Sequence, residues 1–356
     1  MKVNKLIIFG GSFDPIHNGH LKIAKKAFKK IKADKLFFVP CNNHPNEKNI
    51  SASNSERLAM LNLAIQNIPE FEICEFELNN NELSYTVNTI RYFKKNYTNY
   101  ELYLLIGYDQ LVHFKEWNEY QEILDNAKIV CHVRKIDKSL IKQNVDFPYI
   151  KIGFKNINAA SSQLKINPKK SFLNNKVLNY INENAIYVED REKLVLTEYR
   201  LNHCKVVANI AKDLALSHKL YPIVKKAYVA GWYHDYAKDM PKEKLEEIAK
   251  KIKLKNYVSW KVLHGHVAAY IMEKDFFMED YQVLTAVRSH TLPYDFSSLS
   301  KIVYIADKLA PRDDEANQIR KEWAKLAFKD LNLCFETIKN FYDDFYARKN
   351  EEKTEL

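Results

Sequence analysis

The sequence predicts two domains, an α/β front half with a doubly wound parallel sheet and an all-α back half. Its 356 residues are more than most domains with a single hydrophobic core contain. Short apolar runs first alternate with amphipathic helical patterns, which is typical of a parallel sheet covered by helices on both faces. Near residue 190 the charge rises, strand-like runs stop and only helical spacing recurs. We therefore expect domains over residues 1–188 and 189–356.

Six apolar runs are the expected strands of the front half. They are Leu6–Phe9, Leu36–Val39, Phe71–Phe76, Leu102–Ile106, Ile129–Val133 and Tyr149–Phe154. Helical patterns over Leu21–Ile31 and Ser55–Asn67 lie between them, and Val177–Tyr187 closes the domain. In such sheets ligands bind beyond the carboxyl ends of the strands.

Composition narrows the function classes. The net charge of +10 comes from 55 basic against 45 acidic residues. This suits anionic substrates such as nucleotides and does not indicate a specific nucleic-acid partner. The five cysteines are scattered without a Cys-x-x-Cys pair, which argues against a disulfide framework or zinc ribbon. Without a signal peptide or a membrane-length apolar run, we expect a cytoplasmic protein with no membrane partner; a homo-oligomer stays open.

An apolar run that turns through glycines into a helix, over residues 7–21, organises the front half. Gly10 and Gly11 let the backbone approach a ligand, and the helix start directs N–H groups and a positive dipole end toward it. His17 and His20 are three residues apart, so they can share a face. Two imidazoles beside such an anion site suit a reaction that builds negative charge on phosphorus.

The segment GGSFDPIHNGH resembles the signature of the nucleotidyltransferase superfamily, in the form found in nicotinate-nucleotide adenylyltransferases. The resemblance implies a Rossmann-like domain that transfers AMP from ATP to nicotinate mononucleotide, giving deamido-NAD and pyrophosphate with Mg²⁺ on ATP. The alternative, two surface histidines on an ordinary helix, is disfavoured because several uncommon residues coincide in one turn. The resemblance implies that His17 and His20 are catalytic and that Gly10, Gly11, Ser12 and Phe13 bind ATP or substrate.

Three later segments extend this resemblance. Ser84-Tyr85-Thr86 resembles the segment that lines the nicotinate pocket, where Tyr85 could donate to the substrate carboxylate, and its alternative is a helix N-cap by Ser84 or Thr86. The segment Gly107-Tyr108-Asp109 suits a ribose hydroxyl, from which Asp109 would accept a hydrogen bond. Trp117 offers a flat face for the pyridine ring, with a buried core tryptophan as its alternative.

Two further segments supply basic groups. Arg134 ends an expected strand, and we assign it to substrate or ATP binding. Ser161-Ser162-Gln163-Leu164-Lys165 resembles the family's Ile-Ser-Ser-Thr-x-Ile-Arg helix start, which receives ATP phosphates, and either serine would cap that helix. Lys165 stands where the family has arginine. Transfer to another phosphate, such as phosphopantetheine, is the alternative, and Tyr85 and Trp117 argue against it.

In the back half, polar residues recur within apolar helical faces. Nitrogen and oxygen ligands of this kind suit Fe, Mn or Mg, and a pair of metals can be held when a carboxylate bridges them. The alternative is a set of buried, hydrogen-bonded histidines without metal. The set comprises His203, His234, Asp235, His264, His290 and Asp307.

This ordered set resembles the HD superfamily of metal-dependent phosphohydrolases, and most closely the bacterial family that cleaves diadenosine tetraphosphate symmetrically to two ADP. The resemblance implies that the six residues bind a divalent metal pair, that Asp235 is also catalytic, and that Lys238 and Arg288 bind substrate phosphates. His266 is expected not to be a ligand. Two alternatives remain: another substrate, such as an alarmone or a deoxynucleotide, and a nucleotide-sensing module without turnover.

Overall fold

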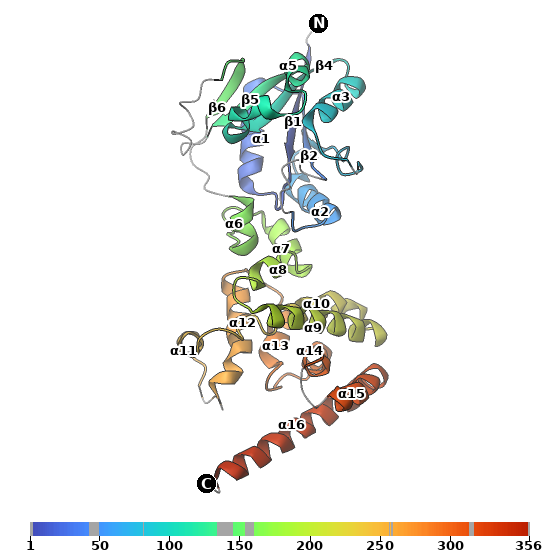
Figure 1. The fold of residues 1–356 in the computed structure, drawn as a ribbon, viewed down its shortest axis with the longest axis vertical. Coiled ribbons are helices and arrows are strands. Elements are labelled where there is room, and N and C mark those ends of the chain that lie inside the picture. The colour runs from blue at the N-terminus through green and yellow to red at the C-terminus, as the bar shows by residue number, and fades with distance from the viewer. Residues whose placement is uncertain are drawn as a thin grey trace. The chain divides into compact units, whose positions relative to one another are not determined.

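The structure is a computed structural model that divides into two compact units, Met1–Leu178 and Asn179–Leu356 (Figure 1). The domain boundary predicted between residues 188 and 189 falls after this division, within the short helix α8 (Val188–Glu192). The described residues are 3–42, 50–80, 82–133, 145–153, 160–255, 257, 259–312 and 317–354.

A six-stranded parallel sheet forms the first unit, with strand order β3-β2-β1-β4-β5-β6. Its strands are β1 (Asn4–Gly11), β2 (Lys35–Pro40), β3 (Phe71–Ile73), β4 (Tyr100–Gly107), β5 (Ala127–Val133) and β6 (Tyr149–Gly153). The predicted doubly wound α/β sheet is therefore confirmed. Only β3 is markedly shorter than expected: after the N–H of Cys74 donates to the carbonyl oxygen of Phe38, the chain leaves the ladder and turns, and the carbonyl oxygen of Glu75 accepts from the N–H of Asn79.

The central strand β1 marks the point where the strand order reverses. It pairs with β2 on one side, where Phe9 lies opposite Phe38, and with β4 on the other, where Ile8 lies opposite Leu104. Parallel strands end at the same edge of a sheet, so the carboxyl ends at Gly11, Pro40 and Gly107 face the crevice where such folds bind ligands.

Helices cover this sheet on both faces (Figure 1). They are α1 (Asn18–Ile31), α2 (Asn54–Ile65), α3 (Thr86–Asn96), α4 (Tyr108–Val112), η1 (Phe114–Glu116) and α5 (Tyr120–Asn126). After the sheet the chain forms α6 (Ser161–Ile166) and α7 (Asn175–Glu183), whose second half belongs to the second unit. The apolar stripe of α1 buries Leu21, Ala24, Ala27 and Ile31, a spacing that follows the helical period.

One expected helix cap is wrong, and so is the cap considered as the alternative role of Ser84 or Thr86. The N-cap of α6 is Ala160, which has no side chain that could cap it; Ser161 lies inside the helix and donates instead to the carbonyl oxygen of Pro15 at 3.0 Å. The N-cap of α3 is Tyr85, without a side-chain cap, so neither Ser84 nor Thr86 holds that position.

The second unit is helical throughout its described residues, which confirms the all-α prediction. After α8 come α9 (Glu198–Ser217), η4 (Tyr221–Ile223), α10 (Val224–Tyr233), α11 (Lys242–Lys251), η5 (Trp260–Val262), α12 (Leu263–Lys274), α13 (Tyr281–Ser289), α14 (Ser298–Leu309), α15 (Asn317–Lys329) and α16 (Leu331–Thr354). Across the parts of the chain that the structure covers, no helix combines the length and apolar character needed to cross a membrane.

A glycine lets the two central helices of this unit approach closely. A Cβ atom on Gly231 of α10 would lie 2.6 Å from the Cα atom of Ala208 on α9. Contacts this short do not occur between real side chains and backbone, so the position requires glycine. The close approach brings the end of α10, which carries His234, against α9, which carries His203.

Candidate functional site

The front unit places His17 and His20 at the start of α1 with their rings stacked, 3.7 Å between centroids. Nδ1 of His17 accepts from the backbone N–H of Gly19 at 3.0 Å, and Nδ1 of His20 accepts from the backbone N–H of His17 at 3.3 Å. An imidazole nitrogen that accepts a hydrogen bond carries no proton, so the neutral rings carry theirs on Nε2. Both histidines therefore present a donor at a helix N-terminus whose first turn has no acidic residue.

The turn before these histidines is fixed by an aromatic ring and a buried guanidinium. Phe13 has a positive φ of 47°, and its ring lies so close that a Cβ on Gly11 would come within 3.1 Å of it. Arg57 is fully buried and donates to the carbonyl oxygens of Ser12 at 2.8 Å and Cys41 at 2.6 Å. It thereby ties the turn after β1 to the end of β2, where Gly10 and Gly11 are paired with Val39 and Pro40.

Lys165, predicted to bind ATP, forms a buried ion pair with Asp14, and its amine also donates to Oγ of Ser51 at 2.9 Å. The carboxylate of Asp14 accepts in addition from the backbone N–H groups of Ser51 and Ala52. Asp14 thus joins the histidine turn to α6. The sequence analysis missed this link because spacing along the chain does not reveal a pairing between such distant residues.

The other residues predicted for this site lie at the carboxyl edge of the sheet or pack beside it. Gly107 ends β4 and caps α4, and the side chain of Asp109 folds back so that its Oδ1 would lie 2.4 Å from a Cβ on Gly107. Tyr85 and Trp117 are half-buried and pack against the same core cluster, while Thr86 is the first residue of α3. Ser162 follows Ser161 at the start of α6. Arg134 lies outside the described residues.

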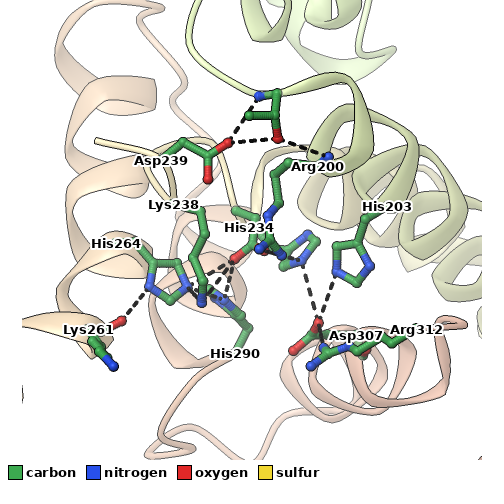
Figure 2. A network of polar contacts seen from close by, with 12 residues as sticks. Arg200, His203, His234, Lys238, Asp239, Lys261, His264, His290, Asp307 and Arg312 are labelled. Atoms are coloured by element: carbon green, nitrogen blue, oxygen red, sulfur yellow. Dashed lines mark hydrogen bonds and ion pairs between the residues drawn. The ribbon is translucent and has the colours of Figure 1, made fainter. Parts of the chain in front are cut away.

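In the helical unit, the six predicted ligands converge from α9, the end of α10 and the turn after it, α12, the end of α13, and α14, and all are buried (Figure 2). Nε2 of His203 lies 3.2 Å and Nε2 of His234 lies 3.7 Å from Oδ1 of Asp307. On the other side of His234, Oδ1 of Asp235 lies 3.0 Å from Nε2 of His264 and 3.5 Å from Nε2 of His290. Two sets, His203–His234–Asp307 and His234–Asp235–His290, each bring three ligand atoms close enough together to hold a metal ion.

Backbone carbonyls fix the rings of three of these histidines. Nδ1 of His234 lies 2.7 Å from the carbonyl oxygen of Gly231, Nδ1 of His264 lies 2.8 Å from that of Lys261, and Nδ1 of His290 lies 2.7 Å from that of Val287. A carbonyl oxygen only accepts, so each Nδ1 carries the proton and each Nε2 presents a lone pair. In each case the accepting residue lies three positions earlier in the chain.

The resulting donor set calls for a cation. Nε2 of His264 and Nε2 of His290 lie only 3.0 Å apart, and Nε2 of the buried His234 has no hydrogen-bond partner among the described residues. Lone pairs this close repel each other unless a positive charge lies between them. Burial lowers the pKa of His234 to about 3 and also lowers the pKa of His264, which disfavours a proton in that role. Imidazole nitrogens and carboxylate oxygens together fit a divalent transition metal.

Positively charged side chains surround the two carboxylates. Arg200 donates to Asp235 at 2.9 Å and Arg312 to Asp307 at 2.7 Å. Burial, the largest single influence, would raise the pKa of Asp307, but the charges of Lys308 and Arg312 and the contacts with His203 and His234 together outweigh it and hold the pKa well below the usual range. The sequence analysis gave Arg200 and Lys308 no role of their own.

The two cations predicted to bind phosphate differ in their surroundings. Nζ of Lys238 lies 3.3 Å from Nε2 of His264 and 3.9 Å from Oδ1 of Asp235, inside the polar cluster, and burial lowers its pKa. Arg288 instead donates to Glu273 at 3.2 Å, outside the cluster.

Glu192 is a second group that the sequence analysis missed. It is fully buried, and neither of its carboxylate oxygens has a hydrogen-bond partner within the described part of the chain. Burial raises the pKa of Glu192 well above its ordinary value, and the nearby charge of Asp235 adds to the effect. Glu192 lies in the charged run near residue 190, where nothing in the local sequence shows that this carboxyl group is buried.

Comparison with known proteins identifies the family of this chain. Residues 8–282 match the model of the cytidylyltransferase-like family, and the chain belongs to that family. Two Mycoplasma proteins named probable nicotinate-nucleotide adenylyltransferase/Ap4A hydrolase extend the match to nearly the whole chain. The one from Mycoplasma genitalium is 42% identical over 90% of this chain and 90% of its own length. The one from Mycoplasma pneumoniae is 37% identical over 93% of this chain and 96% of its own length.

Among solved structures, a Clostridium acetobutylicum protein described as a "predicted HD superfamily hydrolase involved in NAD metabolism" aligns with 46% of this chain and 87% of its own, at 30% identity and a TM-score of 0.42. The Plasmodium falciparum nicotinic acid mononucleotide adenylyltransferase aligns with 52% of this chain and 97% of its own, at 22% identity and a TM-score of 0.44. The predicted resemblance of the chain to a fused adenylyltransferase and hydrolase, and the prediction that it is an enzyme, are confirmed by the two Mycoplasma relatives.

Proposed function

We propose that the chain is a bifunctional enzyme. Its front unit transfers AMP from ATP to nicotinate mononucleotide, giving deamido-NAD and pyrophosphate. Its helical unit has the HD fold and hydrolyses diadenosine tetraphosphate symmetrically to two ADP. The names of the two Mycoplasma relatives, which pair these two activities in one chain, support both halves of the proposal.

The stacked pair of His17 and His20 carries the front-half proposal. In adenylyl transfer a phosphate oxygen of nicotinate mononucleotide forms a bond to the α-phosphorus of ATP, and the bond to the β-phosphate bridging oxygen breaks. Negative charge grows on the phosphoryl oxygens and on the departing pyrophosphate, and no side chain needs to act as a nucleophile. The Nε2–H groups of His17 and His20 and the N-terminus of α1 are positioned to stabilise that charge.

The remaining front-half residues would hold the reactants. Gly10, Gly11, Ser12 and Phe13 in the turn before α1 would bind ATP or substrate. Tyr85 and Thr86 would bind the nicotinate carboxylate, Trp117 would stack on the pyridine ring, and Asp109 beside Gly107 would accept from a ribose hydroxyl. Ser161, Ser162 and Lys165 on α6, together with Arg134, would bind the ATP phosphates. Mg²⁺, when bound with ATP, would neutralise phosphate charge.

Substitution of His20 by alanine tests this half. We expect kcat for deamido-NAD formation to fall by about 10²–10³-fold, the usual cost of losing one charge-stabilising donor, while ATP binding changes much less. Initial rates and equilibrium binding of ATP measure the two quantities separately. Unchanged turnover in His20→Ala would contradict the assignment.

The six converging residues carry the back-half proposal, with His203, His234, Asp235, His264, His290 and Asp307 as ligands of a divalent metal pair, Fe, Mn or Mg. When bound, such metals supply Lewis-acid activation of water and neutralise charge on phosphate oxygens. Hydrolysis then joins the water oxygen to one of the two central phosphorus atoms of diadenosine tetraphosphate, and the bond from that phosphorus to the oxygen bridging it to the other central phosphorus breaks, so each product is ADP.

The protein's own residues would orient the ligands and the substrate. The carbonyl oxygens of Gly231, Lys261 and Val287 hold three imidazoles with Nε2 toward the centre. Asp235, close to both His264 and His290, would supply a carboxylate ligand to the metals and help to orient the attacking water. Lys238, inside the cluster, would bind the phosphates, with Arg288 at its edge.

The test is hydrolysis of diadenosine tetraphosphate by the full-length protein supplied with Mn²⁺ or Fe²⁺, beside a His234→Ala control. We expect ADP as sole product, and none from the control. AMP plus ATP would mean an asymmetric cut and would contradict the symmetric assignment.

A different nucleotide substrate, such as an alarmone or a deoxynucleotide, is the second candidate, and the same assay run on a substrate panel separates the two. A sensing module without turnover is disfavoured because binding alone does not need both Asp235 and Asp307 beside three anchored imidazoles. Metal analysis after gentle purification distinguishes these cases: a hydrolase retains metal, whereas protein free of metal would support the sensing role.

A further inference from the structure

His266 and Tyr294 form a pair of aromatic rings that the proposed reaction does not use. The rings are nearly parallel, with 12° between their planes, and their centroids lie 6.1 Å apart. A flat ring in contact with both would need about 7 Å between them, twice an ordinary carbon–carbon contact distance. The planes of the two rings lie no farther apart than their centroids, so the pair would have to widen by at least about 1 Å to admit a planar heterocycle.

This pair lies directly beside the metal-ligand candidates. His266 follows His264 by two residues on α12, and a Cβ on the intervening Gly265 would lie 3.0 Å from Cε1 of His290. Tyr294 lies in the loop between α13 and α14, where its backbone N–H donates to Oγ of the buried Ser289 at 3.1 Å. Since Ser289 directly precedes His290, the loop is fixed to the end of α13 and the two rings have defined positions next to the cluster.

The surroundings of the pair suit a nucleotide. Tyr294 is 52% exposed, so part of this residue is accessible to a ligand from solvent. Burial lowers the pKa of His266 and raises that of Tyr294, and the charge of Arg288 lowers both, which places this guanidinium near both rings. Arg288 also lies 5.8 Å from the ring of Tyr281, a second exposed aromatic residue on α13. Aromatic rings next to a cation combine a surface for a base with a group for its phosphates.

We propose that His266 and Tyr294 clamp the nucleobase of the nucleotide that the helical unit binds, with Arg288 contacting the adjoining phosphate. The inference rests on the proposed hydrolase function and extends it by naming the residues that recognise the nucleoside end of the substrate. Stacking uses the flat face that every base has, so the clamp favours nucleoside polyphosphates over inorganic polyphosphates without selecting strongly among bases.

Steady-state kinetics with diadenosine tetraphosphate test the clamp. Base stacking on an aromatic side chain is worth about a tenfold change or more in affinity, so Tyr294→Ala and His266→Ala should each raise KM about tenfold with a much smaller effect on kcat. Tyr294→Phe keeps the ring and should bring KM back toward the wild-type value, which a merely structural role of the hydroxyl would not predict. Tyr221→Ala, which removes a tyrosine of 65% exposure elsewhere in the helical unit, is the matched control. KM values of the two alanine variants within twofold of wild type would overturn the proposal.

A binding measurement separates failure of the clamp from failure of the hydrolase. If the wild-type protein does not cleave diadenosine tetraphosphate, the hydrolase proposal fails, and the clamp is judged by calorimetric titration of ADP and of pyrophosphate into the Mn²⁺-loaded full-length protein. The His266→Ala/Tyr294→Ala variant carries an unchanged front unit, so any difference from wild type reports the helical unit. Tenfold weaker binding of ADP with unchanged pyrophosphate binding supports the clamp; equal changes, or none, contradict it.

Discussion

The two units use the same side chain in opposite ways. In the front unit, Nδ1 of His17 and of His20 accepts from backbone N–H groups, which leaves a proton on Nε2. In the helical unit, Nδ1 of His234, His264 and His290 donates to backbone carbonyls, which leaves a lone pair on Nε2. The first pair therefore offers donors to an anion, and the second group offers lone pairs to a cation.

The difference shows that the local backbone, more than the histidine itself, selects the chemistry. The first histidines lie at a helix N-terminus, where N–H groups lack helical partners. His234 and His290 are the C-caps of α10 and α13, where backbone carbonyl groups lack helical hydrogen-bond partners. His264 reaches the carbonyl of Lys261, in the single turn before α12. Each helix end thus supplies the group that sets the tautomer.

The largest effect is expected from replacing a histidine of the second group by glutamine. His234→Gln removes a lone pair held in a fixed direction, so metal content and hydrolysis of diadenosine tetraphosphate should both fall more than a hundredfold, as far as in His234→Ala. Metal analysis and product formation measure this. Adenylyl transfer by the same variant is the internal control and should remain at the wild-type rate. Substantial hydrolysis by His234→Gln would break the comparison.

The same change in the first group should be milder. The amide of glutamine can donate an N–H in place of Nε2–H, so His20→Gln should retain about tenfold more adenylyl transfer than His20→Ala. The ratio of the two kcat values measures the difference. Equal loss in both variants would mean that His20 does more than donate a hydrogen bond.

Gly265 should matter for both the packing and the geometry of the second group. A Cβ there would lie 2.8 Å from the carbonyl oxygen of Val287, which anchors His290. Gly265→Ala should therefore destabilise the helical unit by about 1–3 kcal/mol, the usual cost of overpacking. Denaturant unfolding measures it, with Gly153→Ala as control because a Cβ there meets nothing within 4 Å. Equal stability of the two variants would show that α12 and α13 can separate freely.

The smallest expected effect is on the pH dependence of stability without metal. Burial lowers the pKa of His234 to about 3, so the folded protein keeps this ring neutral where the unfolded chain gains a proton. The free energy of unfolding should therefore decrease as pH falls from about 6.5 toward 3. His234→Gln should reduce that slope by up to about one proton, measured by unfolding of chelator-treated protein at several pH values. An unchanged slope would show that the folded protein protonates this ring as readily as the unfolded chain does.

The sequence predicted the fold better than the details of the sites. Apolar runs and helical spacing predicted the six strands and the all-α second half, because burial imposes periodicity on local sequence. Ser161 was wrongly expected to cap α6, since a serine one residue inside the helix looks the same in the sequence as an N-cap. The Asp14–Lys165 pair depends on which loops the fold brings together, which no local pattern records.

The order of these residues along the chain and their resemblance to the HD superfamily predicted that the second group converges. They did not predict the tautomers of its histidines. The tautomers depend on whether a backbone N–H or carbonyl faces Nδ1, and residue type does not determine this. His234 and His290 were expected within helical patterns and lie instead at helix ends, which is the feature that provides their carbonyl partners.

Nitrogen-15 NMR of the side chains of the 11 histidines in metal-free, histidine-labelled protein tests the opposite tautomers most directly. Single substitutions assign the resonances, and chemical shifts and couplings distinguish Nδ1–H from Nε2–H. We predict Nε2–H for His17 and His20, and Nδ1–H for His234, His264 and His290. A common tautomer in both groups would contradict the account, because helix ends would then not select the anion-binding and cation-binding forms of the same side chain.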